Sequence, residues 1–229
     1  MVAAILRKTT GDYIAKRLMA FLKEVGCAVG DMTIKADQEP ALSSIIEDLS
    51  KIRATEGGGR LVVENSPVGS SASNGVIERH IQVVEQQARV MKSALEEKWA
   101  VGIPSKHCLL PWIIEYAGLL LNRFEVGKDG KTAYERCKGK KAKTLGIEFG
   151  ESVLWKRKPS GGALGKLTCM WEDGVYLGVK AKSGELIVGD KKGVWKTRTV
   201  QRKPMEERWM PEAAEMVVGS VLEDERRRP

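Results

Sequence analysis

The stretch SNGVIERHIQVVEQQARVMKSALEEK, residues 73–98, decides how the rest of the sequence is interpreted. Its apolar residues recur at alternating steps of four and three, which is the spacing of one face of an α-helix. These residues are Ile77, Ile81, Val84, Ala88, Met91 and Leu95. Ser73 or Asn74 suits the N-cap position. The pattern predicts a long helix whose apolar stripe packs on a core.

A carboxylate follows this stripe by one residue in the first turn of the predicted helix. Glu78 lies about 100° around the helix from Ile77, at the edge of the side that is predicted to be buried. From there it could reach the end of a neighbouring strand. The alternative is that Glu78 only complements the positive end of the helix dipole. A second carboxylate close by would favour a site.

Such a carboxylate follows a predicted strand nearer the N-terminus. Residues 32–36 have the composition of a short strand, Asp37 comes next, and Pro40 suits the first turn of a helix. Carboxylates from a strand end and a helix start suit hard divalent cations, which prefer oxygen ligands. Asp37 and Glu78 are therefore candidate catalytic and metal-binding residues, although the pair alone is a weak signal.

Length and composition place the chain among globular proteins of one large or two small domains. Its 229 residues are 42% hydrophobic and 30% charged. The four cysteines have no CxxC spacing, which argues against a structural zinc site. Pro111 and Glu115 interrupt the longest apolar run, residues 108–121. We expect an intracellular protein, in the nucleus or the cytoplasm, that does not enter a membrane.

The net charge of +8 belongs to one region of the sequence. Residues 1–127 contain 15 basic and 15 acidic residues, and residues 204–229 contain 4 and 7, a net −3. Residues 128–203 contain 19 basic and 8 acidic residues, a net +11. Such a block attracts polyanions by neutralising phosphates, without sequence preference, and so indicates nucleic acid. The alternative is a basic surface that is merely solvated.

Patterns of strands and helices alternate in the N-terminal half, which predicts an α/β layer fold. The strands are expected at residues 2–8, 32–36 and 60–64, and the helices at 12–25, 40–53, 73–98 and 106–123. Residues 65–74 are expected to form a loop of small side chains. Trp112 is expected in the core.

From about residue 147 the pattern changes to short alternating runs separated by Gly, Pro and Asp, which predicts a small antiparallel β module. Trp155, Trp171 and Trp195 lie in these runs, and core positions are favoured over a DNA-facing sheet. Residues 204–229 lack periodicity, and we expect a disordered tail there.

Several short words of this sequence occur in the order in which integrases contain them. They are IKADQEPAL at 34–42, ENSP at 64–67, NGVIERHIQ at 74–82, LLPWIIEYAGLLLNR at 109–123, KTAYE at 131–135, EFG at 148–150 and GVYLGV at 174–179. Each word is unspecific, but the order over about residues 1–203 resembles retroviral and retrotransposon integrases, particularly the copia-like branch.

The resemblance implies a ribonuclease-H-like core that is incomplete in its N-terminal strands. This partial catalytic core would span residues 1–126, a basic linker 127–146, the β module 147–203 and the tail 204–229. It also implies polynucleotidyl transfer to DNA, with Asp37 and Glu78 holding Mg²⁺ or Mn²⁺. The candidate nucleic-acid-binding residues are Asn74, Arg79, Gln82, Arg89, Lys138, Lys140, Lys141 and Lys143.

The sequence departs from the family at one position. The family has a further aspartate on the first strand of the sheet, which this chain lacks, and Asp12 is expected next to a turn and does not match. We therefore expect a truncated fragment of a retroelement polyprotein that performs no strand transfer alone. The alternatives are that an upstream segment completes the enzyme, or that the chain is a non-enzymatic nucleic-acid-binding module. A homo-oligomer is left open.

Overall fold

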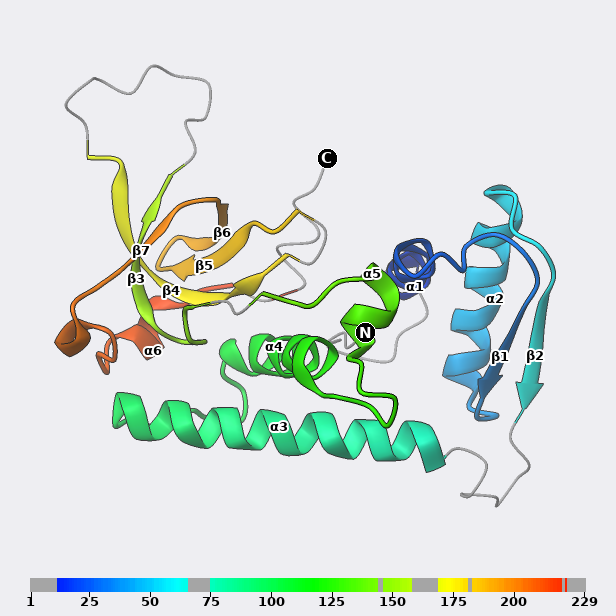
Figure 1. Ribbon diagram of the computed structural model, residues 1–229, viewed down its shortest axis with the longest axis horizontal. Coiled ribbons are helices and arrows are strands. Elements are labelled where there is room, and N and C mark those ends of the chain that lie inside the picture. The colour runs from blue at the N-terminus through cyan, green and yellow to red at the C-terminus, as the bar shows by residue number, and fades with distance from the viewer. Residues whose placement is uncertain are drawn as a thin grey trace. The chain divides into compact units, whose positions relative to one another are not determined.

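The computed structural model describes residues 12–65, 75–143, 146–157, 169–180, 183–219 and 221. These residues form a mixed α/β protein of two compact units (Figure 1). The described residues up to Val83 belong to the first unit and those from Val84 onward to the second, so the division falls within helix α3 (Gly75–Trp99). The strand expected at residues 2–8 lies outside the described residues, and so do residues 66–74 of the expected loop.

The first unit is built on a β–α–β arrangement. Strands β1 (Met32–Ala36) and β2 (Leu61–Asn65) pair in parallel, and helix α2 (Pro40–Thr55) connects them. Helix α1 (Asp12–Glu24) packs on α2. The core residues are Ala15, Met19, Leu22 and Leu49, with Leu18, Ala28, Met32, Ile34, Ile52 and Leu61 packed against them. The unit thus buries the helical stripes against one face of the strands, as α/β layers do.

The sequence predicted this unit well where its pattern was regular. The strand over residues 32–36 is β1 without any shift, and α2 begins at Pro40 as expected. The described part of the first unit contains a sheet of two strands. A ribonuclease-H-like core needs a larger sheet, so that part of the fold remains a prediction.

The apolar stripe of α3 is buried in its second half only. Leu95 and Trp99 are buried, and Met91 packs against the same core, whereas Ile77 and Ile81 are 52% and 53% exposed. The predicted stripe therefore packs on a core over only part of its length. Periodicity shows which face of a helix is apolar, but it does not show how far the neighbouring layer extends.

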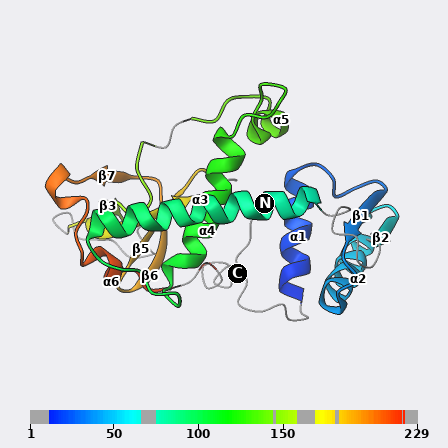
Figure 2. The ribbon, with the colours of Figure 1, turned by 90° about the horizontal axis from the view of Figure 1, so that it is seen from below.

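The second unit combines helices with a five-stranded antiparallel sheet. Helices α4 (Leu109–Phe124) and α5 (Ala133–Lys138) precede the strands. The strands are β3 (Ser152–Lys156), β4 (Trp171–Val179), β5 (Leu186–Asp190), β6 (Gly193–Thr197) and β7 (Val200–Arg202), in the spatial order β6-β5-β4-β3-β7. The expected antiparallel β module is thereby confirmed (Figure 2).

Large aromatic side chains fill the core of the second unit. Trp112 of α4 and Trp155 of β3 are each 1% exposed, and the ring of Trp195 stacks on Trp155 with 5.7 Å between centroids. The main chain of β4 makes room for this stack at Gly174, where a Cβ atom would lie 2.9 Å from Cδ1 of Trp155. These two β-strand tryptophans therefore have a packing role, which was the favoured interpretation.

Residues after β7 are also part of this core. A 3₁₀ helix, η2 (Met205–Glu207), and helix α6 (Ala213–Met216) follow the sheet, and Ala213, Val217 and Val221 are buried. The Sγ of Cys108 donates to the Val217 carbonyl at 2.9 Å. The prediction of a disordered tail was therefore wrong over residues 205–219. A few apolar residues at irregular spacing can fill a gap in a core without producing a periodic signal.

No helix among the described residues is long and apolar enough to cross a bilayer.

Candidate nucleic-acid interface

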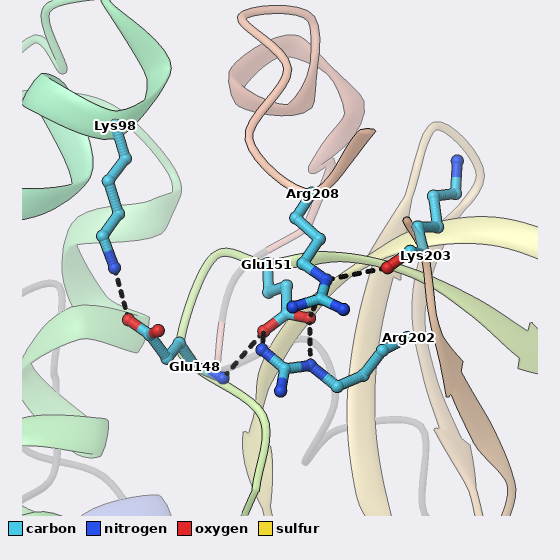
Figure 3. Close-up of polar contacts among 6 residues, drawn as sticks. All are labelled: Lys98, Glu148, Glu151, Arg202, Lys203 and Arg208. Carbon is cyan, nitrogen blue, oxygen red and sulfur yellow. Dashed lines mark hydrogen bonds and ion pairs between the residues drawn. The ribbon is translucent and has the colours of Figure 1, made fainter. Parts of the chain in front are cut away.

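Glu151 is the most buried acidic residue of the basic region. Its side chain is 0% exposed, and its carboxylate accepts hydrogen bonds from Nε and Nη2 of Arg202 at 2.6 and 2.8 Å (Figure 3). The Nε of Arg208 lies 3.5 Å from the same carboxylate. The pKa of Arg202 is raised because Glu151 stabilises its charged form. This carboxylate is therefore neutralised by its own module.

Other acids of the region form ion pairs at more exposed positions. Glu148 forms an ion pair with Lys98 of α3 (Figure 3). Asp173 of β4 forms one with Lys203. Glu172 lies 3.4 Å from a guanidinium nitrogen of Arg157.

Asp190 serves the turn between β5 and β6. It is 5% exposed, and its carboxylate accepts from the main-chain N–H groups of Lys192 and Gly193 at 2.7 and 3.0 Å. Its charge is thus directed into the fold, where main-chain dipoles stabilise it. Asp190 therefore contributes little negative charge to the surface of a region whose net charge is +11.

The densest basic stretch follows α5. Lys138, Lys140, Lys141 and Lys143, here called the lysine run, are all exposed. No acidic residue lies between Glu135 and Glu148 in the sequence. The lysine run therefore offers four positive charges to a polyanion within six residues.

A local network of hydrogen bonds orders the chain that leads into the lysine run. Thr132 caps α5: its Oγ1 accepts from the Glu135 N–H at 3.1 Å, and the Glu135 carboxylate accepts from the Thr132 N–H at 2.8 Å. Gly139 ends the helix in the left-handed region, at φ 67°, and its N–H donates to the Glu135 carbonyl at 2.9 Å. Each end of this six-residue helix therefore has a capping hydrogen bond for its main-chain groups.

Asp129 and Arg136 join the preceding turn to α5. The Nε and Nη2 of Arg136 donate to the two carboxylate oxygens of Asp129 at 3.0 and 2.6 Å. Arg136 holds the pKa of Asp129 well below its usual value. For a carboxyl with a lowered pKa, the stabilisation is present above the unfolded value, about 3.9, and is lost only as the pH falls through the lower folded value. The pair is therefore intact at neutral pH.

The remaining candidate residues do not form one contiguous set. Arg79 and Gln82 lie exposed in the first half of α3, and Arg89 lies exposed in its second half, 3.1 Å from Glu85. Asn74 is outside the described residues. The lysine run is the only predicted set that is contiguous in the described part of the chain.

Asp37 and Glu78 both belong to the first unit. Asp37 directly follows β1, Glu78 lies in the first turn of α3, and both side chains are exposed. The described residues contain no group of three or more His, Cys, Asp or Glu side chains that could hold a metal ion. A pair of carboxylates falls below that number, so a site for Mg²⁺ or Mn²⁺ at Asp37 and Glu78 stays a prediction.

No protein-family model matches this chain, and no curated protein matches its sequence. The likeness to integrases therefore rests on the order of the short words in the sequence.

The sequence contained a signal for the capped helix that its interpretation did not use. KTAYE was treated only as a family word, although Thr132 followed three residues later by Glu135 is the pattern of a capping box. The Asp129–Arg136 pair had no such signal, because its partners are seven residues apart across a turn and a helix.

Proposed function

We propose that the chain binds nucleic acid through the basic surface of its second unit, and that DNA is the nucleic acid, as the likeness to integrases implies. The observation that carries this proposal is the exposed lysine run, which begins at an ordered helix end and has no acidic residue between Glu135 and Glu148 in the sequence. Two acids of the same region, Glu151 and Asp190, are buried and have partners within the fold. Released counterions would supply the binding free energy.

Replacement of the four lysines of the run by alanine is expected to weaken binding to duplex DNA by at least about tenfold near 100 mM salt. The slope of log affinity against log salt should become shallower by up to about 3.6, because each lost phosphate contact removes about 0.9. Titration of labelled duplexes of unrelated sequence at several salt concentrations measures both quantities.

The matched control removes the same number of charges from the first unit. Lys16, Lys23, Lys35 and Lys51 are exposed there, and their replacement by alanine changes the net charge equally. We expect this control to retain most of the affinity and the slope. Equal effects of the two quadruple variants would show that total charge, and not the lysine run, determines binding.

A second candidate function is metal-dependent strand transfer in which Asp37 and Glu78 hold the metal and an upstream segment supplies the further aspartate. The observation that favours it is that both carboxylates are exposed in the first unit, one at the end of a parallel strand and one in the first turn of a helix. The described residues supply this pair and no third acid in a cluster. Two carboxylates suit one hard divalent cation, which prefers oxygen ligands.

Replacement of Glu78 by Gln is expected to weaken Mn²⁺ binding several-fold while leaving the free energy of unfolding within about 0.5 kcal/mol, because Glu78 is exposed. Calorimetric titration of Mn²⁺ and urea unfolding measure the two quantities. Glu47→Gln makes the same charge change at an exposed position of α2 and should leave Mn²⁺ affinity unchanged. If both variants behave alike, Glu78 is not a ligand.

A further inference from the structure

We propose that the Asp129–Arg136 pair is a positioning device, which orders the lysine run so that it meets nucleic acid as a preformed element. This inference rests on the proposed function, because it concerns how the same lysines bind.

The first observation is that hydrogen bonds fix the turn on which Asp129 lies. The Gly127 N–H donates to the Lys131 carbonyl at 3.0 Å, and the Lys131 N–H donates to Oδ1 of Asp129 at 3.2 Å. Val126 and Thr132 form an isolated antiparallel bridge. The Asp129 carboxylate is therefore held in place before Arg136 reaches it with both nitrogens of its fork.

The second observation is that this order contributes little to the core. The side chains of Asp129 and Arg136 are 49% and 48% exposed. None of the residues of α5 is buried. A helix of six residues is too short to be stable by itself, so its order depends on the caps, on the Asp129–Arg136 pair and on contacts with α4. One such contact places the guanidinium of Arg123 5.6 Å from the ring centroid of Tyr134.

The third observation is where the ordered segment ends. Lys138 is the last residue of α5, Gly139 fixes the direction in which the chain leaves the helix, and Lys140 is next. An ordered start means that fewer backbone and side-chain states are lost when these lysines contact phosphates, which strengthens binding without adding charge. The network is thus a scaffold placed directly before the basic residues that would use it.

Two variants separate this positioning role from a simple effect of charge. Arg136→Lys keeps the positive charge but removes the bidentate fork to Asp129. Asp129→Asn removes the pair and raises the net charge by one. If only charge matters, the first variant should bind like the parent chain and the second should bind more tightly. If Asp129 and Arg136 position the lysine run, both variants should bind about three- to tenfold more weakly, as expected when one or two side chains must be ordered on binding.

The salt dependence of binding provides a second test in the full chain. Arg136→Lys should lower the affinity at every salt concentration while leaving the slope of log affinity against log salt unchanged, because no phosphate contact is lost. Amide hydrogen exchange at Gly139 should become faster in both variants, because its N–H is bonded to Glu135 in the ordered helix. Glu56→Gln is the control for the added charge, since Glu56 pairs with Lys23 in the first unit at 2.6 Å.

The outcomes distinguish this inference from the function on which it rests. Parent-like binding of Arg136→Lys, or tighter binding of Asp129→Asn, would overturn the positioning role even if the lysine run binds DNA. Parent-like binding of the quadruple lysine variant would instead overturn the proposed site. Weaker binding of both single variants with an unchanged salt slope and an unaffected Glu56→Gln control would support the positioning role.

Discussion

A chain that ends at Lys203 is expected to lose the cooperative folding of its second unit. The missing residues would remove Ala213, Ala214, Val217 and Val221 from the core, where each is at most 5% exposed. Full burial of a valine contributes about 1.5–3 kcal/mol, so the two valines and two alanines together contribute about 5 kcal/mol or more. A loss of this size is comparable with the whole stability of a small domain.

The loss of hydrogen bonds acts in the same direction. In the folded chain the Trp112 indole N–H donates to the Gly219 carbonyl at 3.2 Å, and Val218 N–H donates to the Asp190 carbonyl at 3.3 Å. Truncation at Lys203 would leave the Trp112 indole N–H without this acceptor and would uncover Gly189, against which Val217 packs. An unpaired buried donor costs about 1–3 kcal/mol.

Near-UV circular dichroism and thermal unfolding test this expectation. A second truncation, after Val221, keeps all of these contacts and is the matched control, so its midpoint should lie close to that of the full chain. Val217→Ser, which keeps the segment but places a hydroxyl in the core, should lower the midpoint by an intermediate amount. An unchanged midpoint for the chain that ends at Lys203 would show that residues 204–221 do not stabilise the unit.

The sequence predicted elements whose residues repeat with a regular period. β1 was predicted from the composition of residues 32–36, and in the structure Met32, Ile34 and Ala36 are the half-buried positions. The antiparallel strands were recognised as short alternating runs between turns. The segment after β7 was missed because its buried residues are irregularly spaced and lie among acidic ones. Local composition favoured disorder there. The order of this segment depends instead on its contacts with Trp112 and Gly189 in the folded unit.

Buried charged residues were the other feature that sequence did not predict. Arg53 was predicted only as the last residue of a helix, yet it is 1% exposed, and its Nη2 donates to the Gly30 carbonyl at 2.7 Å. Glu151 was not singled out, although Arg202, 51 residues away, holds it at the edge of the sheet. Long-range ion pairs and caps of this kind leave no periodic trace, because the partner is set by the tertiary structure.

Part of the candidate interface could also be predicted from the sequence. Charge counts located the lysine run, since a cluster of like charges is visible without a structure. The proposed role of the Asp129–Arg136 pair required the turn that brings the two side chains together. The sequence therefore showed how many basic residues lie together, but not the ion pair that we propose orders them.

Replacement of Gly150 by Ala is expected to destabilise the second unit by about 3 kcal/mol, because two independent constraints meet at this residue. Gly150 has φ +83°, which disfavours any residue with a Cβ atom. An added Cβ would also overlap Cδ1 of Leu95 and lie 3.2 Å from Cζ2 of Trp99. The residue cannot shift easily, since its N–H donates to the Tyr176 carbonyl at 2.8 Å.

Two further variants separate the contributions of backbone conformation and packing at Gly150. Gly146→Ala introduces the same side chain at φ +72° with no atom within 4 Å, so it should show only the conformational cost, about 1 kcal/mol. Leu95→Ala removes the side chain that a new Cβ would overlap. In a double-mutant cycle of Gly150→Ala with Leu95→Ala, the combined loss should be smaller than the sum of the single losses by about 1 kcal/mol or more, because the two residues share one contact. Urea unfolding of the four proteins in the cycle measures this coupling. Strict additivity would show that α3 does not pack against the turn before β3 at this position.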